Sequence, residues 1–178
     1  GGKFLTRILK GQDKIMTELK PTILISESIS EVRTELINIL NPSFNILIAD
    51  TEEDIFGQIN LNPELSIIIM NPVQENLNGF DLVKKFKSFP QLKHISFIFV
   101  ISKDDDVSQI KGLELGVIDF ITLPLKEKIV PTFVKSIIKK HNEVRKEEQA
   151  KILNIQAQEQ KKINSIIHID KVTGIYNE

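Results

Sequence analysis

The middle of the chain alternates short strand-like runs with helix-like segments, and this alternation limits the possible folds more than any other feature. The runs expected to be strands, rich in β-branched and aromatic residues, are 22–26, 44–49, 66–70, 96–101 and 120–122. Several of them are apolar on successive residues, as expected when helices cover both faces of a parallel sheet. The pattern therefore predicts an α/β fold with a doubly wound, five-stranded parallel sheet.

Residues that favour helix N-caps stand where the expected strands end. Ser30, Thr51 and one of the aspartates at 104–106 are predicted to cap the helices that follow them. The three aspartates also suggest a metal cluster. Consecutive side chains point in different directions, however, and acids at a helix start complement its dipole, so we favour capping.

The last helix is expected to continue far beyond the sheet domain. No Pro or Gly occurs between residues 132 and 169, which allows one helix of about 38 residues, roughly 57 Å long. From residue 138 onward a spacing of alternating three and four residues predicts a coiled-coil seam whose apolar members are Ile138, Ile152, Ile155, Ile166 and Ile169. Because the other seam positions are polar, we expect a weak or register-shifting coiled coil, with a solvated single helix as the alternative.

The two ends of the chain differ from its middle. Residues 1–20 carry apolar residues at helical spacing, interrupted by Gly11, and show no chemistry. The last nine residues, DKVTGIYNE, break the helix at Gly174 and resemble the start of another domain, so we expect a piece of a longer protein. The expected parts are a helical extension (1–20), an α/β domain (21–141), a coiled-coil linker (142–169) and the start of a further domain (170–178).

Composition excludes several classes of function. The chain has no Cys and three His, which excludes disulfides, thiolate metal sites and thiol nucleophiles. A formal net charge of -1 gives no overall attraction to nucleic acid, and no apolar run approaches the length that a membrane span needs. We expect a cytoplasmic segment with no nucleic-acid or membrane partner.

Residues 21–141 resemble the receiver domain of two-component response regulators. The resemblance rests on PTILISESISEVRTELINIL, on the helix start NGFDLVKKF at Asn78, and on KGLELGVIDFITLP, together with the spacing between them. In that family two acids after the first strand hold Mg²⁺ and an Asp after the third strand accepts a phosphoryl group. A hydroxyl on the fourth strand and a Lys after the fifth strand then contact that phosphoryl group.

None of the five family positions keeps its usual residue. The resemblance places the acidic pair at Glu27 and Ser28, and the phosphoacceptor at Asn71. The switch hydroxyl falls on Ile101 and the Lys on Leu123.

These departures predict a pseudo-receiver with no metal, no cofactor and no catalytic residue. An Asn amide cannot form an acyl phosphate, and Mg²⁺ sites are anchored by carboxylates, of which only Glu27 remains. For Glu27 we favour a solvated or cap-like carboxylate near the helix that begins at Ser30. Two alternatives stay open: Glu27 as a residual cation ligand, and phosphotransfer with displaced chemistry on Glu27 or Asp50.

The resemblance also implies a dimer. Receivers commonly pair through the face made by the fourth helix, fifth strand and fifth helix, here represented by Lys111, Asp119, Phe120 and Lys135. Because the long helix begins on this face, we expect a homodimer in which two helices run side by side.

The last nine residues resemble the opening of the GGDEF domain of diguanylate cyclases, since Asp170, Thr173, Gly174 and Asn177 match its first signature. The resemblance implies that the chain regulates a C-terminal output domain, a diguanylate cyclase, through the coiled coil. The chain itself would then not be an enzyme. The alternative is a protein–protein adaptor of a two-component pathway without cyclase output.

Overall fold

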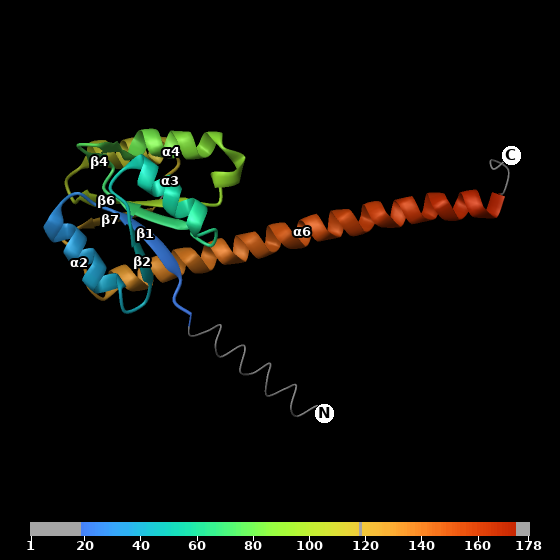
Figure 1. Ribbon diagram of the computed structural model, residues 1–178, viewed down its shortest axis with the longest axis horizontal. Coiled ribbons are helices and arrows are strands. Elements are labelled where there is room, and N and C mark those ends of the chain that lie inside the picture. Colours follow the sequence, from blue (N-terminus) through green and yellow to red (C-terminus); the bar gives the residue numbers. More distant parts are fainter. Residues whose placement is uncertain (1–18, 118, 174–178) are drawn as a thin grey trace, which may run out of the picture. The chain divides into compact units, whose positions relative to one another are not determined.

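The computed structural model describes residues 19–117 and 119–173, which fall into two compact units that divide between Val134 and Lys135. The first unit contains a five-stranded sheet, visible in Figure 1. Its strands are β1 (Thr22–Ser26), β2 (Asn45–Ile48), β3 (Ile67–Met70), β6 (Ser96–Ser102) and β7 (Asp119–Leu123). All neighbouring strands are parallel, in the order β2-β1-β3-β6-β7, which confirms the predicted doubly wound sheet.

Helices cover both faces of this sheet, as Figure 1 shows. The helices are α2 (Ser30–Leu40), α3 (Glu52–Leu61), α4 (Gly79–Ser88), α5 (Asp106–Glu114) and α6 (Ile129–Thr173), with a 3₁₀ turn, η1 (Pro90–Leu92). On one face, α3 and α4 pack with alternate strand residues in a single apolar cluster that includes Ile55, Ile68, Phe86 and Phe99. Burying such a side chain contributes roughly 1.5–3 kcal/mol each, so the cluster holds the strand ends at the site in place.

The helix starts follow the predicted caps at two places and differ at a third. Thr51 Oγ1 accepts a hydrogen bond from Asp54 N at 3.1 Å, and Asp105 accepts one from Ser108 N at 3.0 Å. The prediction for Ser30 is wrong, because α2 begins at Ser30 itself and its N-cap Ile29 has no capping side chain. The helix begins one residue earlier than predicted, so Ser30 lies inside the first turn and not at the cap position.

A short antiparallel hairpin follows β3, and the sequence pattern did not predict it. Its strands, β4 (Val73–Gln74) and β5 (Leu77–Asn78), are two residues long, too short for any periodicity. The hairpin leads directly into α4, whose N-cap Asn78 accepts hydrogen bonds from Phe80 N and Asp81 N. It also places Gln74 beside the ends of β1 and β3.

Helix α6 is one continuous helix of 45 residues, longer than the predicted 132–169. Pro131 stands in its first turn, where a missing N–H costs no hydrogen bond. Every side chain from residue 142 to 167 is exposed, whereas Ile138 is buried, so the exposed part of the predicted seam begins beyond Ile138. The side chain of Ile169 lies outside the described residues, as do most of the predicted extension at 1–20 and of the predicted new domain at 170–178.

No helix in the part of the chain that the structure describes is both long enough and apolar enough to span a membrane.

Candidate functional site

The candidate site lies at the carboxyl edge of the sheet, between β1 and β3. Strand order reverses there, and ligands of open α/β sheets bind at such a reversal. Glu27 follows β1 and Asn71 follows β3, and the structure brings them together: Asn71 Nδ2 donates a hydrogen bond to Glu27 Oε1 at 3.2 Å. The structure thus brings together the side chains at the predicted acidic-pocket and phosphoacceptor positions.

Glu27 supports the start of α2. Its residue is 1% exposed, and the same Oε1 accepts a second hydrogen bond from Ile29 N at 2.9 Å. A carboxylate beside a helix N-terminus is stabilised by the free N–H groups and the helix dipole. Glu27 therefore binds the backbone of Ile29, the residue just before α2.

Both polar atoms of the Asn71 side-chain amide form hydrogen bonds. Its Nδ2 faces Glu27, and its Oδ1 accepts a hydrogen bond from Val73 N at 3.0 Å, at the start of the hairpin. The backbone N of Asn71 donates to Ser26 O at 3.1 Å, which extends the pairing of β1 with β3. The amide at the phosphoacceptor position is therefore a structural link between β1, β3 and the hairpin.

Gln74 closes the same edge of the sheet. Its Nε2 lies 2.8 Å from Asn71 O, 3.1 Å from Ser26 O and 3.3 Å from Ser26 Oγ. Ser26 is fully buried, so these bonds satisfy polar groups that water does not reach. Sequence analysis missed Gln74, because a single Gln in a loop belongs to no motif and is placed only by the tertiary fold.

Arg33 on α2 connects the site to the end of β2. Its Nε donates to Glu27 O at 2.6 Å, and its guanidinium forms an ion pair with Asp50. Asp50, the alternative phosphoacceptor in the sequence analysis, is thus paired with a cation and has an exposed side chain. Arg33 was not predicted, since a basic residue at a helix surface resembles any solvated one.

The remaining family positions supply no charge to the site. Ser28 is exposed, Ile101 is buried in the apolar cluster and Leu123 is half-buried. A Mg²⁺ ion requires carboxylate or carbonyl oxygens as ligands. Here Glu27 Oε1 already accepts hydrogen bonds from two N–H groups, those of Ile29 N and Asn71 Nδ2. The residues therefore do not fit the metal that receivers hold. Among residues 19–117 and 119–173, no three His, Cys, Asp or Glu side chains come together in a way that could hold a metal ion.

Two of the four predicted dimer-face residues, Lys111 and Phe120, contact other side chains of the sheet domain. Lys111 Nζ lies 5.5 Å from the centre of the Phe80 ring. The Phe120 ring contacts Phe99 edge to face, and a Cβ on Gly112 would lie 2.9 Å from its Cζ, so the ring needs glycine on α5. Asp119 is half-buried on β7, and Lys135 is exposed on α6.

Helix α5 presents an apolar surface that the sequence analysis missed. Val107, Ile110 and Leu113 are spaced three residues apart and are 65%, 55% and 51% exposed. Residues at this spacing lie on neighbouring parts of a helix surface. The signal was present in the sequence, but the same spacing also fits a buried helix face.

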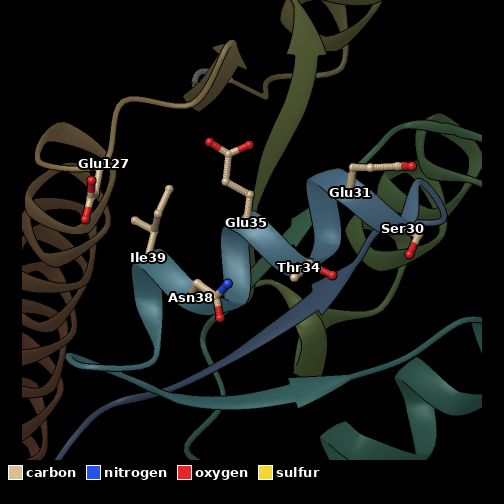
Figure 2. A pocket seen from close by; sticks show the side chains of 7 residues that line it. All are labelled: Ser30, Glu31, Thr34, Glu35, Asn38, Ile39 and Glu127. Atoms are coloured by element: carbon tan, nitrogen blue, oxygen red, sulfur yellow. The ribbon is translucent and has the colours of Figure 1, made fainter.

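An open groove of about 500 Å³ runs beside α2, away from Asn71. Figure 2 shows Glu127 facing α2 across it, with Ile39 and Glu35 on the opposite side. Its lining includes three carboxylates and no basic side chain, so its chemistry disfavours anions such as phosphate. It contains none of the predicted site residues.

Solved structures with the same architecture come from response regulators. A response regulator of Chloroflexus aurantiacus superimposes with a TM-score of 0.62 and 22% identity, over 68% of this chain and 99% of that one. A receiver-modulated diguanylate cyclase from Pelobacter carbinolicus gives 0.56 and 22%, over 72% and 99%. The first unit has the receiver fold.

Proteins similar in sequence to this receiver-fold domain include a rice response regulator, ORR3, which is 24% identical over 71% of this chain and 98% of its own length. Histidine kinase P4 of Formosa agariphila is 28% identical over 71% of this chain, and the response regulator PleD of Caulobacter vibrioides is 30% identical over 40% of it. The chain spans 9% of the kinase and 16% of PleD. No family model matches the chain.

Proposed function

We propose that this chain is a pseudo-receiver, a receiver-fold domain that takes no phosphoryl group and acts in signal transduction by pairing with a second copy. The observation that carries the proposal is the hydrogen bond from Asn71 Nδ2 to Glu27 Oε1, 3.2 Å long. In receivers the residue at the position of Asn71 is a carboxylate, and it lies beside a metal ion. Here a neutral amide satisfies the neighbouring carboxylate directly.

The chemistry of the site supports this proposal. Phosphoryl transfer to a receiver needs a carboxylate nucleophile and positive charge to balance the developing phosphate charge. Asn71 supplies no nucleophile, and the half-buried Leu123 supplies no charge. In this proposal the site has no phosphorylated state, and the domain transmits signals through contacts on its surface.

Helix α6 is the proposed route by which the domain acts on an output domain. It continues for 45 residues, and the stretch 170–178, which begins in its last turn, resembles the opening of the GGDEF domain of diguanylate cyclases. PleD and the Pelobacter cyclase, which are similar to this chain, are consistent with such an arrangement. We therefore propose a diguanylate cyclase as the output.

A helix pair can control such an enzyme by alignment. Two GGDEF domains must face each other, each presenting one GTP, so small changes in the pairing of the helices change the rate. In this proposal the pseudo-receiver sets the pairing, and the chain itself catalyses no reaction.

The test uses the complete open reading frame, from its natural start to its natural stop codon. The purified protein is incubated with GTP and Mg²⁺, and cyclic dinucleotide is measured. We expect product, and we expect Ile155→Asp to lower the rate at least about tenfold because a charge enters the helix pair. Leu153→Asp, a matched change at another exposed apolar position of α6, serves as the control. GTP left intact by the unmodified protein would contradict the cyclase output.

The second candidate function is an adaptor in a two-component pathway without cyclase output. Its support is the similarity to histidine kinase P4, which covers 71% of this chain. An adaptor would form a stable complex with a purified histidine kinase of the same organism while GTP stays intact. The apolar surface of α5 would then be the place to introduce charges that disrupt the complex.

A further inference from the structure

The sequence of α6 repeats every eleven residues. After Ile129 the helix consists of four segments, 130–140, 141–151, 152–162 and 163–173, which read VPTFVKSIIKK, HNEVRKEEQAK, ILNIQAQEQKK and INSIIHIDKVT. The first position holds Val130, His141, Ile152 and Ile163. The fourth holds Phe133, Val144, Ile155 and Ile166, and the eighth holds Ile137, Glu148, Glu159 and Asp170.

An eleven-residue period matters because it is close to a whole number of helical turns. Eleven residues make three turns at 3.67 residues per turn, against 3.6 in a straight α-helix. The first and fourth positions therefore stay on one side of α6 along its whole length. A seven-residue period corresponds to 3.5 residues per turn, below the 3.6 of a straight helix, and winds two helices into a left-handed coil. An eleven-residue period lies above 3.6 and gives a right-handed coil.

The apolar members of this stripe are exposed. Val144, Ile152, Ile155, Ile163 and Ile166 are between 49% and 60% exposed, over a stretch where every side chain is classed as exposed. A monomeric soluble protein rarely leaves a continuous apolar stripe uncovered. The same stripe on a second copy has the same period and so matches it at every repeat.

The seven-residue seam of the sequence analysis shares only part of this stripe. Both frames contain Ile152, Ile155 and Ile166. The seven-residue frame places Arg145 and Lys162 in the seam, whereas the eleven-residue frame replaces them with Val144 and Ile163. Burying apolar side chains costs far less than burying unpaired cations, so over residues 144–166 the eleven-residue frame is the more favourable one.

We infer that α6 pairs in parallel with α6 of a second copy through an eleven-residue seam formed by the first, fourth and eighth positions of its repeats. The parallel direction rests on the proposed function, since only that direction brings two output domains to the same end. The register is carried independently by the periodicity. The pair is straight to right-handed, unlike a seven-residue coiled coil.

The eighth positions weaken this seam. Glu148 and Glu159 lie between the apolar positions of successive repeats, about 16–17 Å apart along the helix. In a parallel pair each glutamate faces the same residue of the second copy, and facing like charges lower the stability of the pair. Lys151 and Lys162 stand three residues further on, where each can pair with the acid of its own helix.

The test uses cysteine scanning, which this chain permits because it contains no cysteine. Four single variants of the 178-residue chain are oxidised and run on non-reducing gels: Val144→Cys, Arg145→Cys, Lys162→Cys and Ile163→Cys. A disulfide needs Cα atoms within about 7 Å, so only seam positions link to themselves in a parallel pair. We expect dimers at 144 and 163, and at least about tenfold less at 145 and 162.

Each other result overturns a stated part of the inference. Cross-linking at 145 and 162 instead would overturn the eleven-residue register and leave the proposed dimer intact. A mixture in which Val144→Cys links to Ile163→Cys, while neither links to itself, would overturn the parallel direction. No cross-link at any of the four positions, with a monomer in sedimentation at high concentration, would overturn the inference and the dimer of the proposed function together.

Discussion

At the scale of single residues, Asn71 has the most consequential side chain of the domain. Its amide donates to a buried carboxylate and accepts from the hairpin that follows β3. A carboxylate of the same size could make only the second of these bonds. The side-chain nitrogen of Asn71 therefore satisfies a buried carboxylate that an aspartate at this position would repel.

The first prediction replaces that nitrogen with an oxygen. Asn71→Asp places two carboxylates at hydrogen-bond distance, and like charges so close disfavour the ionised pair. We expect the free energy of unfolding to fall by about 1–3 kcal/mol at neutral pH in EDTA. Millimolar Mg²⁺ should restore part of this loss, as measured by thermal unfolding.

A neutral control separates charge from lost hydrogen bonds. Asn71→Ala removes the same bonds without adding a carboxylate, so its stability should fall and should not respond to Mg²⁺. An equal response of both variants to Mg²⁺ would contradict this explanation.

The second prediction concerns Asp105, the N-cap of α5. Hydrogen bonds from the side chain and the backbone N–H of Ser108 lower the pKa of Asp105 below its usual value of 3.8. A pKa lowered by folding adds stability that is complete above the unfolded-state pKa and is lost as the pH falls through the folded-state pKa.

Asp105→Ala should therefore lower the free energy of unfolding by about 1 kcal/mol at pH 7, and by less below pH of about 4. Asp105→Asn keeps a capping oxygen and should lose less at pH 7. Denaturant unfolding across this pH range measures both. A difference between Asp105→Ala and the unmodified chain that stays constant down to pH of about 3 would argue against the lowered pKa.

Residue types predicted the site only in part. Glu27 and Asn71 were found because each follows an expected strand, and parallel strands end at one edge of a sheet. Ser30 was assigned a cap, but α2 begins one residue earlier than the pattern indicates, and the Glu27 side chain accepts a hydrogen bond from the N–H of Ile29 just before the helix. Gln74 and Arg33 act through contacts between distant segments, which no local pattern encodes.

At the scale of elements, α5 and α6 expose apolar surfaces that their own domain does not cover.

The third prediction concerns α5, where Ile110 is 55% exposed. If α5 lies in the dimer interface, Ile110→Glu should weaken self-association at least about tenfold, because a buried unpaired charge is costly. Gln109→Glu adds the same charge at the neighbouring exposed position and should change little. Sedimentation velocity over a concentration series measures both, and equal effects would place the interface elsewhere.

The fourth prediction concerns the acids of α6. Glu148→Leu removes a facing charge from the proposed seam and adds an apolar layer, so the dimer should become at least about tenfold tighter. Glu147→Leu makes the same change one residue away, outside the seam, and should leave the affinity unchanged. Sedimentation equilibrium compares them. Equal tightening by both variants would mean that general hydrophobicity is responsible and that the seam is not.

Elements were easier to predict than surfaces. The buried strands were recognisable because residues such as Ile67, Ile68 and Ile69 are apolar without alternation, which only a doubly covered sheet produces. The continuous helix followed from the absence of Pro and Gly. The hairpin of β4 and β5 was missed because two-residue strands have no period, and the surface of α5 because apolar spacing alone does not show which residues remain uncovered.

At the scale of the whole molecule, a receiver-fold domain with a neutral amide at its phosphoacceptor position leads into a helix of 45 residues, and we propose one function for both parts. Each part is explained by the other. A domain with a neutral amide at its phosphoacceptor position needs another way to act, and an exposed, periodically apolar helix provides one. Pairing of two copies would then be the event that the domain controls.

The most direct test of the central claim is the intact mass of the chain after incubation with acetyl phosphate and Mg²⁺, beside an ordinary receiver treated in the same way. The account predicts that the ordinary receiver gains a phosphoryl group and that this chain keeps its mass, because Asn71 offers no carboxylate. A phosphoryl adduct on this chain, mapped to Glu27, Asp50 or any residue at the carboxyl edge of the sheet, would contradict it.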